Sequence, residues 1–320
     1  MRALRLRNGR LEVVDAPRPA HPGECLIRVK AAGICGTDLE LVKGYAAFSG
    51  IPGHEFVGVV ERASRPEDGH WVGRRVVGDI NIGCGVCSRC REGVKEHCES
   101  RRVLGIREHD GAFAEYLTLP SGNLHLVPDS VGDLAAVFVE PIAAACRILE
   151  QVSFGPATRT AVLGDGRMGL LIAQVLAAAG APVELFCKHD DRLALAQAIG
   201  LQARRSADAD PAAGERFDVV VEATGAADGL MRALALVRPR GTVVLKSTVH
   251  DPAAMATWPI VVDEIAVVGS RCGPFGPALE LLAQGAVRID PLVTCVTGLD
   301  DFERAFREAA TGLKAVFAIS

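Results

Sequence analysis

Residues 160–177, TAVLGDGRMGLLIAQVLA, decide the fold of the second half of this 320-residue chain. Thr160–Leu163 is a continuous apolar run that predicts a buried strand, and the helical pattern Leu170–Ala179 follows it. Between them stands G-x-G-x-x-G, a turn that lets a pyrophosphate approach the backbone and the helix N-terminus. The sequence therefore predicts a dinucleotide site whose cofactor-binding residues include Gly164, Gly166, Arg167, Met168 and Gly169.

Strands and helices alternate through the rest of this half. The expected strands are Val183–Cys187, Phe217–Glu222, Thr242–Lys246 and Ile265–Val268, with a weaker one near Gln202. The expected helices are Asp191–Ile199, Gly229–Val237, Pro277–Gln284 and Leu299–Thr311, before a last strand, Ala315–Ile319, that returns to the first domain. This alternation predicts an α/β fold with a doubly wound parallel sheet. Thr224 is a further candidate for cofactor binding.

The residue that would contact the adenosine ribose of the cofactor is not acidic. In NAD-binding folds an acid at the end of the second strand grips the ribose 2′-hydroxyl. That place falls on Cys187, and Lys188 and His189 follow it, whereas Glu184 lies in mid-strand. Two bases without an acid suit a 2′-phosphate, so we hypothesise a preference for NADP over NAD. The alternative is that Lys188 and His189 form a solvated loop.

The first half reads as short strands separated by turns. Segments 24–30 and 56–61 alternate apolar and polar residues with period two, and no long helix is evident before Asp133. We expect a compact, twisted β-barrel. A charged fraction of 23 %, a hydrophobic fraction of 49 % and a net charge of −4 are ordinary for a globular protein and give no electrostatic footprint for nucleic acid.

Four of the ten cysteines follow the spacing C-x2-C-x2-C-x7-C, at Cys84, Cys87, Cys90 and Cys98. One tight loop with this spacing can fold four thiolates around a tetrahedral zinc ion that keeps no open position. Gly83, Gly85 and Gly93 suit the turns of such a loop. A zinc ribbon that reads nucleic acid is an alternative, but Glu92, Glu96 and Glu99 dilute the local excess of basic residues.

A second set of ligand types lies within about twenty residues. Gly33-Ile34-Cys35-Gly36-Thr37-Asp38 and Gly53-His54-Glu55 together offer a thiolate, an imidazole and carboxylates, which zinc accepts. Later, Glu140-Pro141 precedes an apolar helical run, with Pro141 expected at its first position. Glu140 is either a helix-start acid, favoured there by the helix dipole, or a carboxylate aimed at a metal.

These motifs, in this order and over essentially the whole length, resemble the medium-chain, zinc-dependent alcohol dehydrogenase family. The Glu140-Pro141 pair is most similar to the branch that acts on polyols, sugars and threonine. The resemblance implies a GroES-like catalytic domain, expected at 1–149 and 273–320, interrupted by a Rossmann domain at 150–272. It also implies an active site in the cleft between these domains.

The same resemblance implies roles for individual residues. Cys35 and His54 would hold the catalytic zinc, and Glu55 or Glu140 would complete the set, so both are candidate metal ligands and catalytic residues. Thr37 would relay the substrate proton and Asp38 would support the site. Many relatives have a histidine where this chain has Glu40, which leaves the proton's exit path open. Cys84, Cys87, Cys90 and Cys98 would hold the structural zinc.

The expected function is hydride transfer between a secondary alcohol, such as a polyol or sugar, and NADP or NAD. Alternatives are a zinc-free NADPH-dependent reductase of activated double bonds, a biosynthetic or lyase-like enzyme with one oxidation step, and a non-catalytic nucleotide-binding protein. The N-terminus does not resemble a signal peptide, and no apolar run would span a bilayer. We therefore expect a cytoplasmic homodimer or homotetramer that acts on a small alcohol or carbonyl compound without nucleic-acid or membrane partners.

Overall fold

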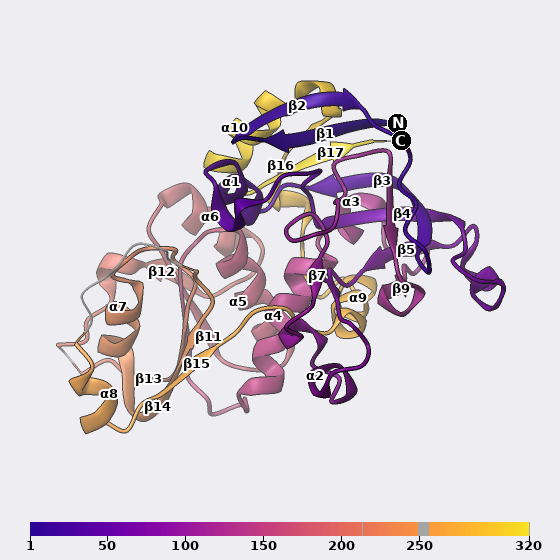
Figure 1. Ribbon diagram of the computed structural model, residues 1–320. Coiled ribbons are helices and arrows are strands. Elements are labelled where there is room, and N and C mark those ends of the chain that lie inside the picture. Colours follow the sequence, from indigo (N-terminus) through magenta and orange to yellow (C-terminus); the bar gives the residue numbers. More distant parts are fainter. Residues whose placement is uncertain (213, 249–255, 320) are drawn as a thin grey trace. The chain divides into compact units, whose positions relative to one another are not determined.

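The computed structural model describes residues 1–212, 214–248 and 256–319 and divides into two compact units (Figure 1). Unit 1 comprises Met1–Glu140 and Ile289–Ser320, and unit 2 comprises Pro141–Arg288. The domain boundaries expected from the sequence, at 149/150 and 272/273, remain a prediction. Within the described ranges, no helix is long and apolar enough to cross a membrane.

Unit 2 is built on a six-stranded parallel sheet with the order β12-β11-β10-β13-β14-β15. Its strands are β10 (Thr160–Leu163), β11 (Val183–Cys187), β12 (Ala203–Arg205), β13 (Phe217–Glu222), β14 (Val237–Leu245) and β15 (Ala266–Gly269). Its helices are α5 (Arg167–Ala178), α6 (Asp190–Ala198), α7 (Gly229–Leu236), α8 (Trp258–Val262) and α9 (Phe275–Ala283). The predicted doubly wound sheet is confirmed.

The strand order reverses between β10 and β13. Leu163, at the end of β10, is the register partner of Phe186 in β11 on one side and of Glu222 in β13 on the other. The carboxyl ends of these three strands therefore meet at one edge of the sheet. In open parallel sheets, ligands bind outside the carboxyl ends of the strands at such a switch point. Buried apolar side chains such as Phe186 and Phe217, which meet edge to face, hold the strands in place.

Unit 1 contains a seven-stranded sheet of order β16-β17-β3-β4-β5-β9, with β8 paired to β3. Its strands are β3 (Cys25–Gly33), β4 (Glu55–Arg62), β5 (Arg75–Gly78), β8 (Tyr116–Leu119), β9 (Leu124–Leu126), β16 (Val293–Thr297) and β17 (Lys314–Ala318). Two-stranded ribbons pair β1 (Arg2–Arg7) with β2 (Arg10–Asp15) and β6 (Asn81–Ile82) with β7 (Arg102–Val103). Because β17 pairs with β3, the expected return of the chain's end to the first domain is confirmed.

The helices of unit 1 are short. They are α1 (Gly36–Val42), α2 (Ser88–Arg91), α3 (Asp133–Ala136) and α10 (Phe302–Thr311). Helix α4 (Val139–Gln151) begins two residues before Pro141, so the expectation that Pro141 occupies its first position was wrong. Proline is tolerated here because the first four backbone N–H groups of a helix have no partner within the helix.

Candidate active site and cofactor site

Cys35, His54 and Glu55 converge because two antiparallel strands end side by side. Gly33, the last residue of β3, is the register partner of Glu55, the first residue of β4. Cys35 lies just beyond the end of β3 and His54 just before the start of β4, so both are at the same end of this strand pair. One ligand atom from each of Cys35, His54 and Glu55 lies within 4.8 Å of the others.

A fully buried carboxylate, Asp38 in α1, fixes this arrangement. Its Oδ2 accepts the backbone N–H of Cys35 at 2.8 Å, and its Oδ1 accepts that of Gly53 at 3.2 Å. Oδ1 also lies 3.5 Å from Nδ1 of His54. Burial lowers the pKa of His54, but Asp38 and the Cys35 sulfur outweigh it and raise the pKa well above its ordinary value. A metal ion must displace that proton, so its affinity here falls as the pH falls.

The residues present fit a zinc ion. Among the buried side chains that the structure describes, Nδ1 of His54 is a ring nitrogen without a hydrogen bond. His54 belongs to a group of one sulfur, one imidazole and one carboxylate, which are zinc's preferred donors. Three protein donors leave the fourth tetrahedral position open, as catalytic zinc sites require.

Glu55 also forms a buried ion pair that the sequence analysis missed. Its Oε2 pairs with Nζ of Lys314, the first residue of β17, and both side chains are at most 1 % exposed. A Cβ on Gly33 would lie 2.6 Å from this oxygen, so only glycine leaves room for the pair. A lysine in an otherwise apolar terminal strand was the signal in the sequence, but its partner lies far away in the chain.

The other expected residues of this site are placed differently. Thr37, in α1, has its Oγ1 3.8 Å from the Cys35 sulfur. Glu140 lies in the first turn of α4 and, in the portion of the chain that the structure describes, does not join the group formed by Cys35, His54 and Glu55. Glu40 pairs with the exposed ammonium of Lys43 at 2.8 Å.

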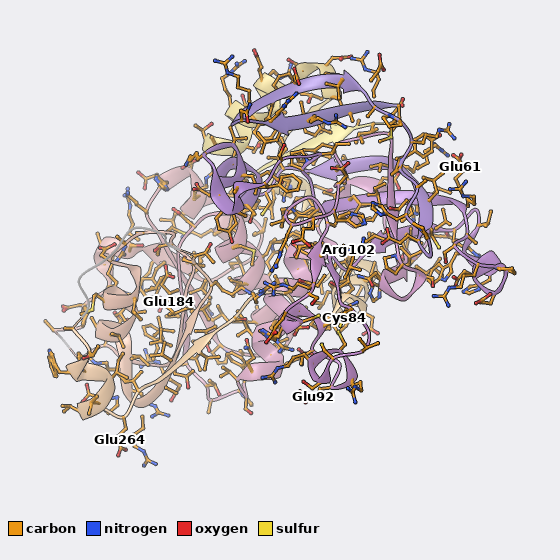
Figure 2. All side chains as sticks on the ribbon, in the orientation of Figure 1. Glu61, Cys84, Glu92, Arg102, Glu184 and Glu264 are labelled. Carbon is orange, nitrogen blue, oxygen red and sulfur yellow. The ribbon has the colours of Figure 1, made fainter. Side chains whose placement is uncertain are left out.

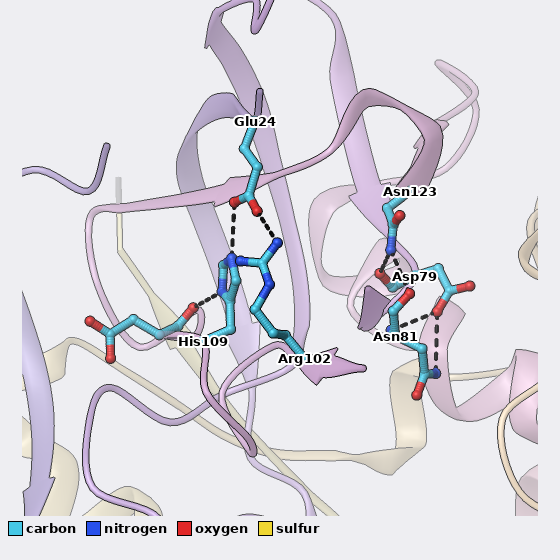
Figure 3. Close-up of polar contacts among 7 residues, drawn as sticks. Glu24, Asp79, Asn81, Arg102, His109 and Asn123 are labelled. Carbon is cyan, nitrogen blue, oxygen red and sulfur yellow. Dashed lines mark hydrogen bonds and ion pairs between the residues drawn. The ribbon is translucent and has the colours of Figure 1, made fainter. Parts of the chain in front are cut away.

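A buried charge network supports the segment before His54 (Figure 3). Glu24 accepts hydrogen bonds from Nη2 of Arg102 at 2.7 Å and from Nε2 of His109 at 2.9 Å. Nδ1 of His109 lies 2.8 Å from the carbonyl oxygen of Asp110, so each ring nitrogen lies beside an acceptor. The adjoining backbone, 111–113, donates hydrogen bonds to the carbonyls of residues 51–53.

The neighbours of Glu24 determine the pKa of its carboxyl group. Burial raises the pKa of Glu24, but the hydrogen bond and the charge of His109, together with Thr118 and Arg102, lower it to about 2. The carboxylate is therefore ionised at neutral pH, and its contact with His109 stabilises the segment whose backbone bonds to residues 51–53.

The four cysteines form a second group on a separate, exposed lobe that carries α2 and Glu92 (Figure 2). Their sulfurs all lie within 4.8 Å of one another. Tetrahedral zinc with Zn–S bonds of about 2.3 Å would set them about 3.8 Å apart, so the group fits a closed zinc site. Gly85 and Gly93 adopt φ of 78° and 80°, which the turns between the ligands require.

Local backbone groups prepare this lobe for a cation. The backbone N–H groups of Val86 and Cys87 lower the pKa of Cys84, which favours the thiolate form of this sulfur. Nζ of Lys95 pairs with Asp79 at 3.1 Å and ties the lobe to the segment after β5. Asp79 belongs to a small polar network in which Asn123 donates to the carbonyls of Asp79 and Asn81 (Figure 3).

The glycine-rich turn of unit 2 needs its glycines for close approach. A Cβ on Gly169 would lie 1.8 Å from the Gly164 carbonyl oxygen, and one on Gly164 would lie 2.5 Å from that of Ala223. Gly164 also has φ of 115°. Helix α5 begins at Arg167, directly after this turn, and its N-terminal N–H groups suit a pyrophosphate.

Two side-chain networks surround this turn. Oε1 of buried Glu222 accepts hydrogen bonds from the N–H and hydroxyl of Thr224 and from Ser247, which fixes the loop after β13. At the end of β11, Cys187 is buried, whereas Lys188 and His189 are exposed. Asp165, which the sequence analysis treated only as an unspecified position of the motif, accepts hydrogen bonds from that segment.

A unit with a closed four-cysteine group and an open Cys-His-Glu group, next in the chain to a nucleotide-binding parallel sheet, defines a zinc-dependent dehydrogenase. Residues 21–129 match the family model of the alcohol dehydrogenase GroES-like domain, and residues 134–319 match that of the glucose dehydrogenase C-terminus. The chain belongs to the zinc-dependent medium-chain alcohol dehydrogenase family.

Individual relatives agree with this assignment. The chain is 33 % identical to D-altritol 5-dehydrogenase of Agrobacterium fabrum, with 82 % of this chain and 79 % of the relative covered. It is 26 % identical to an alcohol dehydrogenase (rspB) of Escherichia coli complexed with NADH, with a TM-score of 0.91 and 99 % of each chain covered. A zinc-binding dehydrogenase of Sinorhizobium meliloti bound to NADP is 29 % identical, with a TM-score of 0.89 over 99 % and 98 % of the two chains.

These findings establish the class of activity. The protein is an oxidoreductase that uses zinc and a nicotinamide cofactor, NAD or NADP, to interconvert an alcohol and a carbonyl compound. The fold joins a GroES-like domain and a Rossmann domain, as the resemblance implied.

Proposed function

We propose that this protein oxidises a secondary hydroxyl group of a polyol or sugar, with NADP as the preferred cofactor. The observation that carries the proposal is the convergence of Cys35, His54 and Glu55, which offers three donors and leaves a fourth position for a substrate oxygen. The polyol class is supported by D-altritol 5-dehydrogenase, which covers most of this chain at 33 % identity.

Each residue of the proposed site has a separate role. Zinc bound by Cys35, His54 and Glu55 would supply Lewis acidity at the substrate oxygen. Asp38 orients His54 and the backbone of Cys35 through the contacts described above. The hydroxyl of Thr37, close to the Cys35 sulfur, would accept the proton of the substrate hydroxyl. The nicotinamide of a cofactor bound at the glycine-rich turn of unit 2 would supply the hydride acceptor for the carbinol carbon.

Glu55 is the favoured third ligand, with Glu140 as the alternative. Glu55 shares the group with Cys35 and His54, and Lys314 compensates the charge of the Oε2 oxygen. Cys84, Cys87, Cys90 and Cys98 would hold a second zinc that stabilises the lobe, since four thiolates leave no position for substrate.

The proposed preference for NADP rests on the end of β11. Buried Cys187 stands where an NAD enzyme keeps an acid for the ribose, and Lys188 and His189 expose basic side chains directly after it. Gly164, Gly166, Arg167, Met168 and Gly169 would bind the pyrophosphate, and Thr224 would contact the cofactor from the loop after β13.

A substrate panel tests this function. Polyols, sugars and simple secondary alcohols are assayed with NADP and with NAD by nicotinamide absorbance. We expect a polyol or sugar to give the highest kcat/KM, and a higher value with NADP than with NAD. A preference for simple alcohols would contradict the substrate class, and a far higher kcat/KM with NAD would contradict the cofactor preference.

Metal analysis separates the proposal from its rivals. About two zinc ions per chain are expected, one for each ligand group. One zinc ion per chain would favour a non-catalytic nucleotide-binding protein that retains only the structural site. No zinc, together with NADPH-dependent reduction of activated double bonds, would favour the zinc-free reductase.

We also propose that two or four copies of the chain associate through β15. This strand ends the sheet and is largely exposed, and an open strand edge is a template for pairing with another chain. Trp258, Val261 and Val262 of α8 are 65–75 % exposed. Light scattering on the purified protein tests this, and Val267→Lys in β15 should shift an oligomer towards the monomer.

A reducing cytoplasm suits the four-thiolate group, because oxidation would remove its ligands.

A further inference from the structure

Asp165 makes contacts that a G-x-G-x-x-G turn does not require. It occupies the position between the first two glycines, and its side chain is only 9 % exposed. Its Oδ2 accepts the backbone N–H groups of Lys188 and His189, each at 2.8 Å. The same oxygen lies 3.0 Å from Nδ1 of His189. One carboxylate oxygen of the glycine-rich turn therefore holds the segment that follows β11.

These contacts lie at the end of β11, the part of the fold that distinguishes NADP from NAD. The NAD and NADP molecules are distinguished only by the 2′-phosphate, which folds of this type meet at the end of the second strand. Asp165 also acts on the last residue of β11. Burial and the negative charge of Asp165 together raise the pKa of Cys187 to about 12. Asp165 thus lies beside the strand end that lacks an acid of its own.

Two roles are conceivable for a carboxylate at this point, and the geometry separates them. A free carboxylate would accept the ribose hydroxyls and repel a 2′-phosphate, as in NAD enzymes. Oδ2 of Asp165 already faces three donors, and little of the side chain is open to solvent. The side chain of His189, by contrast, is 58 % exposed, and that of Lys188 is exposed as well.

We infer that Asp165 is a positioning residue for a 2′-phosphate site, and that it holds Lys188 and His189 in the orientation that binds NADP. The inference rests on the proposed NADP preference. Arg205 adds a basic residue at this end of the sheet, because it ends β12 as the register partner of Cys187. Its guanidinium pairs with Asp190 at the start of α6, so a bound phosphate would compete with that carboxylate.

Cofactor titration of Asp165 variants tests the inference. NADPH and NADH are titrated into the zinc-loaded protein, and binding is followed by nicotinamide fluorescence without substrate. We expect Asp165→Ala to raise the Kd of NADPH about tenfold while the Kd of NADH changes less than about twofold. Asp165→Asn keeps an acceptor for the backbone N–H groups but loses the charge opposite His189, so its effect should be intermediate.

Asp191→Asn is the matched control. It removes one negative charge from the same helix start, where Asp191 is 73 % exposed and lies 3.6 Å from Arg192, without touching the segment that Asp165 holds. We expect NADPH affinity to stay the same or rise slightly, since the variant only lowers repulsion. Amide hydrogen exchange at Lys188 and His189 should accelerate in Asp165→Ala and not in Asp191→Asn.

The remaining outcomes overturn the inference. Tighter NADPH binding and weaker NADH binding in both Asp165 variants would make the carboxylate the ribose acceptor. Equal weakening of both cofactors would make it a general support of the glycine-rich turn. If Asp165→Ala does not fold, the Kd values of NADPH and NADH are compared in Asp165→Asn and His189→Asn instead.

This test is distinguishable from a failure of the proposed function. A wild-type protein that binds NADH more tightly would refute the NADP preference itself. A wild-type protein that prefers NADPH, with Asp165 variants that keep this preference, would refute only the positioning role.

Discussion

The two groups of zinc ligands differ in ligand type, in their spacing along the chain and in exposure to solvent. The four-cysteine group is uniform, comes from one stretch of 15 residues between Cys84 and Cys98, and lies on an exposed lobe with Cys84 open to solvent. The Cys35, His54 and Glu55 group is mixed, joins the ends of two strands, and is surrounded by the buried charges of Asp38 and Lys314. The first group can only hold an ion, whereas the second can also expose it to a substrate.

Loss of a ligand from the mixed group should have the largest effect on activity. Cys35→Ser keeps the size of the side chain but removes the thiolate, so we expect kcat/KM to fall at least about a thousandfold. NADPH binding by unit 2 should be unchanged. Steady-state kinetics and fluorescence titration measure the two effects.

Cys295→Ser in β16 is the control, because this cysteine belongs to neither ligand group. Normal turnover in Cys35→Ser would refute the zinc site at Cys35, His54 and Glu55. Loss of cofactor binding together with activity would indicate general misfolding.

Loss of a ligand from the uniform group should affect stability instead. Cys87→Ser should release the structural zinc, because three thiolates no longer close the site, and should cost several kcal/mol of unfolding free energy, on the order of 5 kcal/mol. Any soluble protein should retain catalytic zinc and measurable turnover. Zinc analysis and thermal unfolding test this, and an unchanged melting temperature would contradict it.

The Glu24 network should make unit 1 sensitive to acid. The pKa of Glu24 is about 2 in the folded protein against an ordinary value of 4.5, so its contribution is complete above pH 4.5 and is lost as the pH falls through about 2. Glu24→Gln leaves Arg102 and His109 without their carboxylate partner, and we expect a destabilisation of about 3 kcal/mol at pH 7.

Urea unfolding of Glu24→Gln and its parent, followed through Trp71 in a Trp258→Phe background, measures this difference between pH 7 and pH 2. The difference should shrink towards zero at pH 2. A difference that stays constant over this range would mean that the ionised carboxylate is not the stabilising group.

The smallest effect should come from a turn of the cysteine lobe. Gly85 has φ of 78° with open space around it, so Gly85→Ala meets only backbone strain, about 1 kcal/mol. Gly122→Ala is the matched control, because Gly122 also has open space but no positive φ. Thermal unfolding of both variants isolates the strain, and equal melting temperatures would contradict its role.

The sequence could predict those parts of the site that are local in the chain. The cysteine lobe, the glycine-rich turn and the Gly53-His54-Glu55 segment each carry their spacing within a few residues. The pairs Glu55–Lys314, Glu24–His109 and Asp165–His189 join residues that are far apart in the sequence, and only the strand order and register bring them together. The start of α4 before Pro141 was missed for another reason, since a proline fits any position of a first turn.

The central claim is that unit 1 holds two zinc ions in chemically different sites. Crystallography of the zinc-loaded protein with X-rays at the zinc absorption edge tests it most directly. The account predicts two anomalous peaks per chain, one among Cys84, Cys87, Cys90 and Cys98 and one shared by Cys35, His54 and Glu55. A single peak at the four cysteines, with the Cys35 and His54 side chains bonded only to protein groups, would contradict it.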